Sequence, residues 1–287
     1  MRLLQSDDDS NLSLTEFLES AIPNYAILSH KWGANEVTFK DLTDGTSKSK
    51  ASGYSKIQFC RKQARRDGLQ YFWIDTCCID KSSSAELSEA INSMFRWYQE
   101  AARCYVYLSD VSTEDRKASD VSAKCTWESA FRASKWFTRG WTLQELLAPI
   151  SVEFYSQEGK SLGNKTTLGQ QIHEITGIPI SALQGSELSQ FSSNQIFGWA
   201  KNRQTTREED WVYSLLGIFG ISMPIIYGEG RKNAVRRLTK EMDVMSECSW
   251  DLYVTDPRVD TNHIETFPPL TGEADILDAW YCTMKSS

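Results

Sequence analysis

The sequence has 287 residues, 40% of them hydrophobic and 24% charged, with a formal net charge of −7. A chain of this length and composition can bury the core of a globular protein, and its acidic balance argues against a nucleic-acid partner. Because no run of about 18 apolar residues occurs and the N-terminus lacks the apolar stretch of a signal peptide, we expect a cytoplasmic protein without a membrane span.

Short apolar runs rich in aromatic and β-branched residues predict buried strands. They cover residues 25–29, 71–75, 104–108 and 151–155. A helix is predicted over residues 54–68, with Gly68 as its C-cap, and another over residues 83–101, with Ser83 and Glu86 at capping-box spacing. Alternating strands and helices predict an α/β fold, a parallel sheet flanked by helices, with ligands beyond the carboxyl ends of the strands.

The chain beyond the last predicted strand has helical patterns. After a charged, loop-like stretch at 111–133, helices are predicted over residues 167–177, 205–220 and 228–246, the second with Thr206 and Glu209 at capping-box spacing. No flexible linker precedes this part, so we expect a C-terminal helical extension packed on the sheet rather than a separate domain. The predicted boundaries are an α/β core over 1–158, a helical extension over 159–247 and a linker or tail over 248–287.

The residues that follow the predicted strands are candidates for binding a ligand, because the carboxyl ends of parallel strands meet at one edge of a sheet. They are Ser29, His30, Trp32, Asp75, Cys77, Asp80 and Ser109.

A helix predicted over residues 139–149 carries Trp141 and Glu145 on one face and leucines on the other. The leucines explain the fold and leave Glu145 unexplained, because a carboxylate on a helix that enters a core needs a cleft, a partner or a function. Two interpretations stay open at this point. Glu145 is either a functional residue or a structural acid, paired for instance with Arg139 or Arg207.

Several other chemistries are disfavoured by the sequence. Neither a P-loop nor a Gly-x-Gly-x-x-Gly motif occurs, and the three histidines are not at metal-ligand spacing, so we expect no metal site. Seven scattered cysteines without a Cys-x-x-Cys pair predict reduced thiols. His30 with Cys77 or Cys78 is an alternative nucleophilic pair, against which stands the tendency of free cysteine to be buried.

Long segments of the sequence, in order, resemble the fungal heterokaryon incompatibility (HET) domain, the death-inducing module of vegetative incompatibility proteins. The resemblance covers residues 1 to about 245 and predicts a HET domain over 1–247. The segment "DPRVDTNHIE" (256–265) resembles the connector before the NACHT domain of fungal NOD-like receptors, so the chain is either a lone effector module or part of a longer receptor. The matching segments are "YAILSHKWG", "GYSKIQFC", "WIDTCCIDKSSSAELSEAINSMFRWYQEAARCYVYLSDV", "SKWFTRGWTLQELLAP", "RQTTREEDWVYSLLGIFGI" and "MPIIYGEGRKNAVRRL".

HET domains in turn resemble Toll/interleukin-1 receptor (TIR) domains, whose fold is flavodoxin-like and whose enzymatic members cleave NAD⁺. The catalytic helix of those enzymes carries Trp-x-x-x-Glu, which Trp141 and Glu145 reproduce. The resemblance implies that Glu145 is catalytic, that NAD⁺ is a substrate and no cofactor is needed, and that activation involves a homo-oligomer. It also implies that Trp141 or Trp32 stacks on nicotinamide.

One carboxylate is sufficient for this reaction in chemical terms. Nicotinamide departs as a neutral molecule, so the leaving group needs no acid, and a fixed carboxylate stabilises the oxocarbenium-like ribose. The sequence therefore predicts an NAD⁺ glycohydrolase of fungal cell death. A non-catalytic module that signals by homotypic assembly is the alternative, and a cysteine hydrolase comes third.

Overall fold

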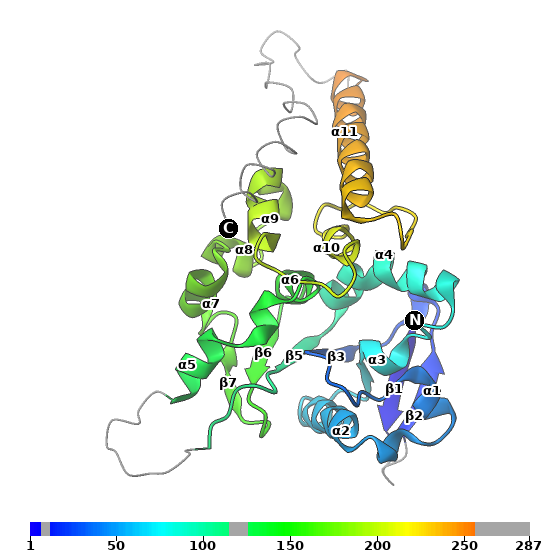
Figure 1. The fold of residues 1–287 in the computed structure, drawn as a ribbon, viewed down its shortest axis with the longest axis vertical. Helices are drawn as coiled ribbons and strands as arrows, with labels where there is room; N and C mark the ends of the chain where they lie inside the picture. Colours follow the sequence, from blue (N-terminus) through cyan, green and yellow to red (C-terminus); the bar gives the residue numbers. More distant parts are fainter. Residues whose placement is uncertain (7–11, 115–125, 256–287) are drawn as a thin grey trace. The chain divides into compact units, whose positions relative to one another are not determined.

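The computed structural model describes residues 1–6, 12–114 and 126–255, without the side chains of Thr126 and residues 245–255. The chain divides into two compact units after Ile225. The first unit contains the sheet and most helices, and the second contains the long helix α11 (Arg231–Thr255) (Figure 1).

One mixed sheet of seven strands, in the order β2-β1-β4-β3-β5-β6-β7, forms the centre of the first unit. The four inner strands are parallel, whereas β2, β1 and β7 are added antiparallel at the two edges. The predicted α/β class and its parallel strands are thus confirmed, and the edges are not parallel. The strands are β1 (Arg2–Ser6), β2 (Leu12–Glu16), β3 (Tyr25–His30), β4 (Tyr71–Trp73), β5 (Arg103–Tyr107), β6 (Val152–Tyr155) and β7 (Ser161–Asn164).

Helices lie between successive inner strands in the chain. Taken in chain order, these strands lie in the order 2-1-3-4, which is the order of flavodoxin-like sheets. Figure 1 shows α2 (Ala51–Arg66) and α4 (Ser84–Glu100) on opposite sides of the sheet, because the strand order reverses at β3. All six residues of β3 are buried, which explains its nearly continuous apolar sequence.

The remaining helices are short. They are α1 (Phe39–Thr43), α3 (Asp75–Cys78), α5 (Thr126–Arg132), α6 (Thr142–Leu147), α7 (Gly169–Thr176), α8 (Ile180–Leu183), α9 (Ser193–Ala200) and α10 (Asp210–Tyr213), with 3₁₀ turns η1 (Glu19–Ala21), η2 (Ser47–Ser49), η3 (Lys135–Thr138) and η4 (Leu188–Gln190).

Of the two predicted capping boxes, the first is present only in part and the second is absent. Ser83 is the N-cap of α4 and accepts from the Glu86 amide at 3.3 Å, but the Glu86 carboxylate instead accepts from Arg2 and from the Asp80 amide. The second box is wrong, because Glu209 is itself the N-cap of α10.

The helix predicted over 205–220 is also shorter than expected, because α10 ends at Tyr213. Gly217 lies so close to Phe95 that an added Cβ would be 2.0 Å from the phenylalanine Cβ, and Gly220 has φ +68°. Both glycines therefore serve a tight turn rather than a helix.

Three other segments differ from the expectations. Helix α5 lies within the predicted loop 111–133, of which residues 115–125 are outside the described residues. Helix α11 continues to Thr255, past the expected start of a tail, and residues 256–287 are again outside the described part. None of the helices within the described ranges has the length and apolarity needed to cross a bilayer.

Candidate functional site

Helix α6, which carries Glu145, is buried on nearly all sides. Leu143 and Leu146 are fully buried, as the apolar pattern predicts, but Gln144 is buried as well and Glu145 is only 8% exposed. Trp141, the N-cap of α6, is half-buried. The face of α6 that carries Glu145 is thus covered, because other parts of the first unit pack around so short a helix.

The Glu145 carboxylate is bound from the neighbouring strand. The Ser29 hydroxyl, near the carboxyl end of β3, donates to Oε2 of Glu145. The same hydroxyl oxygen accepts from Nε1 of Trp136 at 2.8 Å. An indole nitrogen can only donate, so the Ser29 proton is left for Glu145. The structure therefore brings Ser29 and Glu145 together, as the strand-end position of Ser29 suggested.

The surroundings of Glu145 disfavour its charged form. Burial raises the pKa of Glu145 most, the hydrogen bond from Ser29 and the attraction of Arg139 lower it, and the nearby charge of Asp75 raises it. The net result is a pKa of about 7. The Tyr98 hydroxyl, which donates to the Leu28 carbonyl at 3.2 Å, also favours the ionised form. The neutral form of Glu145 is therefore favoured far more than that of an exposed glutamate.

The structural interpretation of Glu145 predicted a basic partner, Arg139 or Arg207. Arg139 attracts Glu145 from a distance, but no ion pair joins Glu145 to a basic side chain of the described residues. Glu145 thus accepts a hydrogen bond from the neutral Ser29 hydroxyl, and the charges of Arg139 and Arg203 act on it without forming an ion pair. A buried carboxylate without a paired cation is energetically costly, and such groups concentrate at functional sites.

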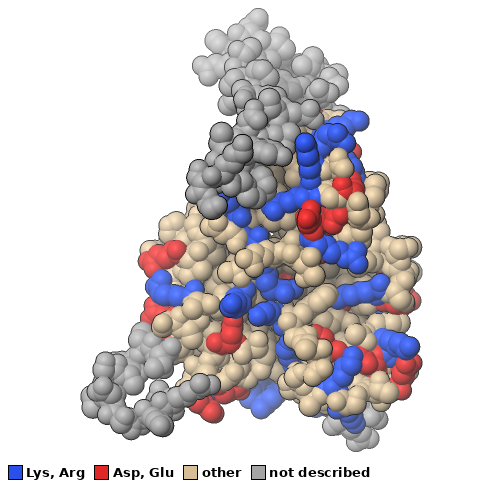
Figure 2. Space-filling model, viewed as in Figure 1, with Lys and Arg blue, Asp and Glu red and all other residues tan. Residues whose placement is uncertain are grey.

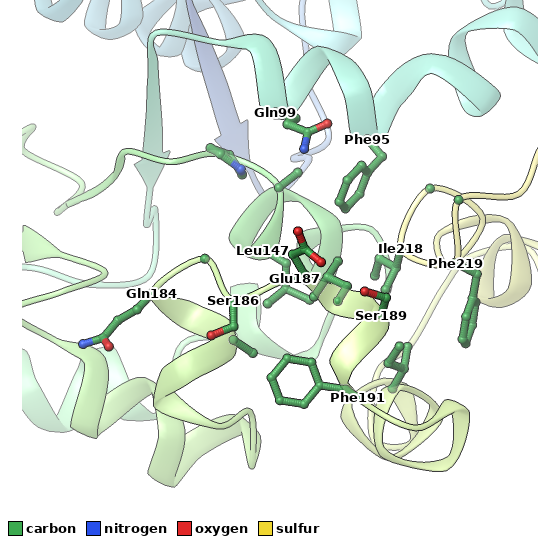
Figure 3. A pocket seen from close by; sticks show the side chains of 18 of the residues that line it. Phe95, Gln99, Leu147, Gln184, Ser186, Glu187, Ser189, Phe191, Ile218 and Phe219 are labelled. Atoms are coloured by element: carbon green, nitrogen blue, oxygen red, sulfur yellow. The ribbon is translucent and has the colours of Figure 1, made fainter. Parts of the chain in front are cut away.

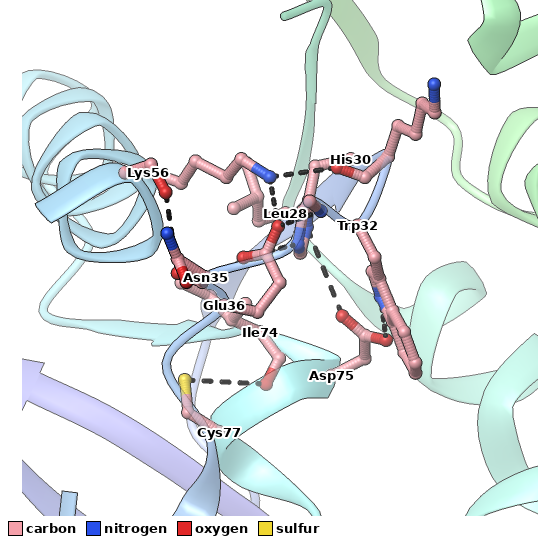
Figure 4. A network of polar contacts seen from close by, with 12 residues as sticks. Leu28, His30, Trp32, Asn35, Glu36, Lys56, Ile74, Asp75 and Cys77 are labelled. Atoms are coloured by element: carbon pink, nitrogen blue, oxygen red, sulfur yellow. Dashed lines mark hydrogen bonds and ion pairs between the residues drawn. The ribbon is translucent and has the colours of Figure 1, made fainter. Parts of the chain in front are cut away.

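His30 lies on the other side of β3 from Ser29, because successive strand residues point to opposite faces. Figure 4 shows His30 close to Glu36 and Asp75. It is 4% exposed, with Nε2 3.5 Å from Oε2 of Glu36 and Nδ1 4.0 Å from Oδ1 of Asp75. Neither ring nitrogen has a hydrogen-bond partner in the described part of the chain.

Glu36 is held in its charged form beside His30. Burial raises the pKa of Glu36, but His30, the Lys56 ammonium and the Gly33 amide outweigh it and leave a pKa of about 2. The Lys56 ammonium also donates to the Lys31 carbonyl at 2.8 Å. The loop after β3 is thus tied to α2, and the carboxylate beside His30 is fixed.

Trp32 and Asp75 form the exposed rim of this cluster. Nε1 of Trp32 donates to Oδ2 of Asp75 at 2.8 Å, and the indole is 44% exposed. The Lys81 ammonium lies 3.6 Å from the centre of the Trp32 ring and 3.6 Å from Oδ2 of Asp75. The ring face therefore already holds a cation.

The other predicted binding residues lie outside this cluster. Asp80 accepts from the amide and hydroxyl of Ser82, which lowers the pKa of Asp80. Ser109 is exposed in the turn after β5.

The cysteine alternative is not supported by the geometry. Cys77 is fully buried, its thiol is directed at the Ile74 carbonyl 3.8 Å away, and burial raises its pKa well above the usual value. Cys78 accepts from the Ile74 amide at 3.4 Å. Among the described residues Cys60, Cys77, Cys78 and Cys104 are free thiols, as predicted.

Two further residues position the site, and the sequence did not predict their roles. Trp136 is buried, and its indole N–H donates to the Ser29 hydroxyl and so orients it. The buried Arg203 donates to Oγ1 of Thr142 at 2.8 Å and to the Arg139 carbonyl at 2.9 Å, which fixes the first turn of α6. No local pattern signals either contact, because the partners are distant in the sequence.

Comparison with known proteins identifies the family. The family described as "Heterokaryon incompatibility protein (HET)" matches residues 25–145, from the first residue of β3 to Glu145. The chain carries a HET domain. The HET-domain chain is also 53% identical over 290 residues to "Vegetative incompatibility protein HET-E-1" of Podospora anserina, a match that covers 100% of this chain and 21% of that protein. The chain thus spans about a fifth of the length of that relative.

The matched HET segment contains Ser29 and Glu145 as well as His30 and Asp75. No solved structure gives a significant match. Among the described residues of the HET-domain chain, no group of three or more His, Cys, Asp or Glu side chains is arranged to hold a metal ion.

Proposed function

We propose that this chain is a cell-death effector of vegetative incompatibility that hydrolyses NAD⁺ to nicotinamide and ADP-ribose products. The observation that carries the proposal is the placement of Glu145, a buried carboxylate with no ionic partner among the described residues, beside the carboxyl end of β3. Ligands of open parallel sheets bind at that edge, near the point where the strand order reverses. The 2-1-3-4 order of the inner strands agrees with a TIR-like fold.

Five residues at the carboxyl ends of the inner strands and on α6 have roles in the proposed reaction. The ionised Glu145 stabilises the positive charge that develops on the ribose, and Ser29 fixes the orientation of the carboxylate. The exposed Trp32 indole stacks on the nicotinamide ring. His30 and Asp75 supply polar contacts to ribose or phosphate. NAD⁺ is then the substrate, and the reaction needs no cofactor.

Access to Glu145 requires a further step, because the residue is only 8% exposed. We propose that assembly of protomers displaces the side chains that cover it, so that activity rises steeply with protein concentration. In a longer protein, a NACHT-type receptor region would bring the modules together.

The direct test is release of nicotinamide by purified protein over a series of concentrations. Glu145→Gln should lower the rate by about 10²–10³-fold, because it removes the stabilising charge. Glu174→Gln, an exposed acid on α7, is the matched control and should leave the rate unchanged. Equal rates in the wild type and Glu145→Gln would exclude the proposed role.

A second function, non-catalytic signalling by homotypic assembly, is favoured by the burial of Glu145 against the neutral hydroxyl of Ser29. In that case Glu145 is a structural acid. Cell death in a fungal host then separates the two functions: Glu145→Gln abolishes toxicity if NAD⁺ cleavage kills the cell, and leaves it intact if assembly alone does so.

A further inference from the structure

A second feature of the first unit lies beyond the C-terminal end of α6. A cavity of about 680 Å³ is lined by Leu147 at the end of that helix, by Phe95 of α4, and by Phe191, Ile218 and Phe219 (Figure 3). Its volume is within the range of small-molecule sites. Its mixture of apolar walls and a few polar groups is also typical of such sites.

Lys165, which follows β7, also lines this cavity and is only 6% exposed. Its ammonium donates to the Pro149 carbonyl, and its amide donates to the Val152 carbonyl at 3.0 Å. No described carboxylate forms an ion pair with it. Pro149 follows α6, so the ammonium caps that helix end, but this role uses one of three N–H groups. Buried charges are normally paired, and this one lacks a counter-charge.

The cavity also contains the carboxylate of Glu187, which Figure 3 shows in the same space as Phe95 and Phe191. Glu187 is exposed, so water weakens the effect of its charge without removing it, whereas the charge of Lys165 is shielded from water. The buried positive charge therefore outweighs the screened negative one within the cavity.

We infer that this cavity binds a small aromatic organic anion, whose acidic group pairs with Lys165 and whose ring packs against Phe95, Phe191 and Phe219. This inference does not rest on NAD⁺ cleavage, because the cavity contains none of the residues proposed for that reaction. Lys165 supplies the charge recognition, and the phenylalanines supply apolar contact area.

A pair of fluorescent probes tests the inference. 8-Anilinonaphthalene-1-sulfonate is an aromatic anion, and N-phenyl-1-naphthylamine has the same rings without the sulfonate. Titrations of the folded wild-type protein should give one saturable site for the anion. Lys165→Met should weaken the anion about tenfold or more and change the affinity for the neutral probe less than twofold, because only the charged hydrogen bond is lost.

Matched variants define the site. Lys160→Met changes an exposed lysine near by in the sequence and should leave both affinities unchanged. Glu187→Gln should tighten the anion severalfold, since it removes a repulsive charge. Ser189→Trp, from the exposed rim, should fill the cavity and remove binding of both probes.

Three results would overturn the inference. The first is that the anion binds the wild type and Lys165→Met with equal affinity. The second is that Lys165→Met loses affinity for both probes to the same extent. The third is that Ser189→Trp binds the anion as tightly as the wild type. Thermal melting identifies which variants are folded. If Lys165→Met does not fold, the other two variants still test the inference, because anion affinity should rise in Glu187→Gln and fall in Ser189→Trp.

Discussion

Trp136 determines which way the Ser29 hydroxyl points. The indole Nε1 donates to Oγ of Ser29 at 2.8 Å, and that oxygen directs its proton to the Glu145 carboxylate. Glu145 is thus held from the sheet side by a donor whose orientation is itself fixed. A carboxylate positioned in this way needs little reorganisation when positive charge develops beside it.

The hydrogen bonds from Trp136 to Ser29 and from Ser29 to Glu145 predict how the pH dependence of nicotinamide release will shift in variants. The activity requires ionised Glu145, so it should rise with pH around the pKa of about 7. Ser29→Ala removes a hydrogen bond that favours the ionised form, so the midpoint of the profile should move to higher pH. Trp136→Phe keeps the ring and frees the hydroxyl to rotate, and we expect a smaller shift in the same direction. A profile that does not move in Ser29→Ala would contradict this.

A second prediction concerns stability and pH. The folded pKa of Glu145, about 7, is above the ordinary value of 4.5. Its contribution to stability is therefore fully present below about pH 4.5 and is lost as the pH rises through 7. Glu145→Gln cannot ionise, so between pH 5 and 8 it should gain on the order of 2 kcal/mol relative to the wild type.

Denaturant unfolding of the wild type and Glu145→Gln at pH 5 and at pH 8 measures this difference in the free energy of unfolding. Glu174→Gln serves as the control and should show no such gain. A difference between wild type and Glu145→Gln that stays constant from pH 5 to 8 would show that Glu145 titrates normally.

A third prediction concerns the cation over Trp32. The Lys81 ammonium occupies the face of the Trp32 ring that we assign to the nicotinamide ring of NAD⁺. In intact NAD⁺ that ring is a pyridinium, so two cations compete for the same face. Lys81→Met should therefore tighten binding of N-methylnicotinamide, a pyridinium cation, by severalfold. Quenching of tryptophan fluorescence measures the affinity without any turnover, and neutral nicotinamide is the control ligand. Weaker binding of the cation in Lys81→Met would mean that Lys81 supports the site rather than occupies it.

A fourth prediction compares two glycines. An added Cβ at Gly217 would collide with the Cβ and ring of Phe95, whereas at Gly198, in α9, it would meet nothing within 4 Å. Gly217→Ala should destabilise the fold by about 2 kcal/mol or more. Gly198→Ala should stabilise it by up to about 1 kcal/mol, because alanine favours the helix. Thermal melting of both variants checks the contrast, and similar effects of the two would refute the close packing at Phe95.

The sequence by itself determined the inner sheet and the position of Glu145. The strands that begin at Tyr25 and Val152 are nearly continuous apolar runs, a signal that depends only on the burial of both sheet faces. The antiparallel strands β1, β2 and β7 contain no such run, because polar residues interrupt their few leucines, so their sequences do not differ clearly from those of loops.

Only the tertiary structure decided what surrounds Glu145. Helical spacing places Glu145 one turn from Trp141, but it cannot tell which distant segments will cover that face. The contact of Trp136 with Ser29 spans 107 residues, and that of Arg203 with Thr142 spans 61. Hydrogen bonds between such distant residues depend on how the elements pack, and no local pattern in the sequence encodes them.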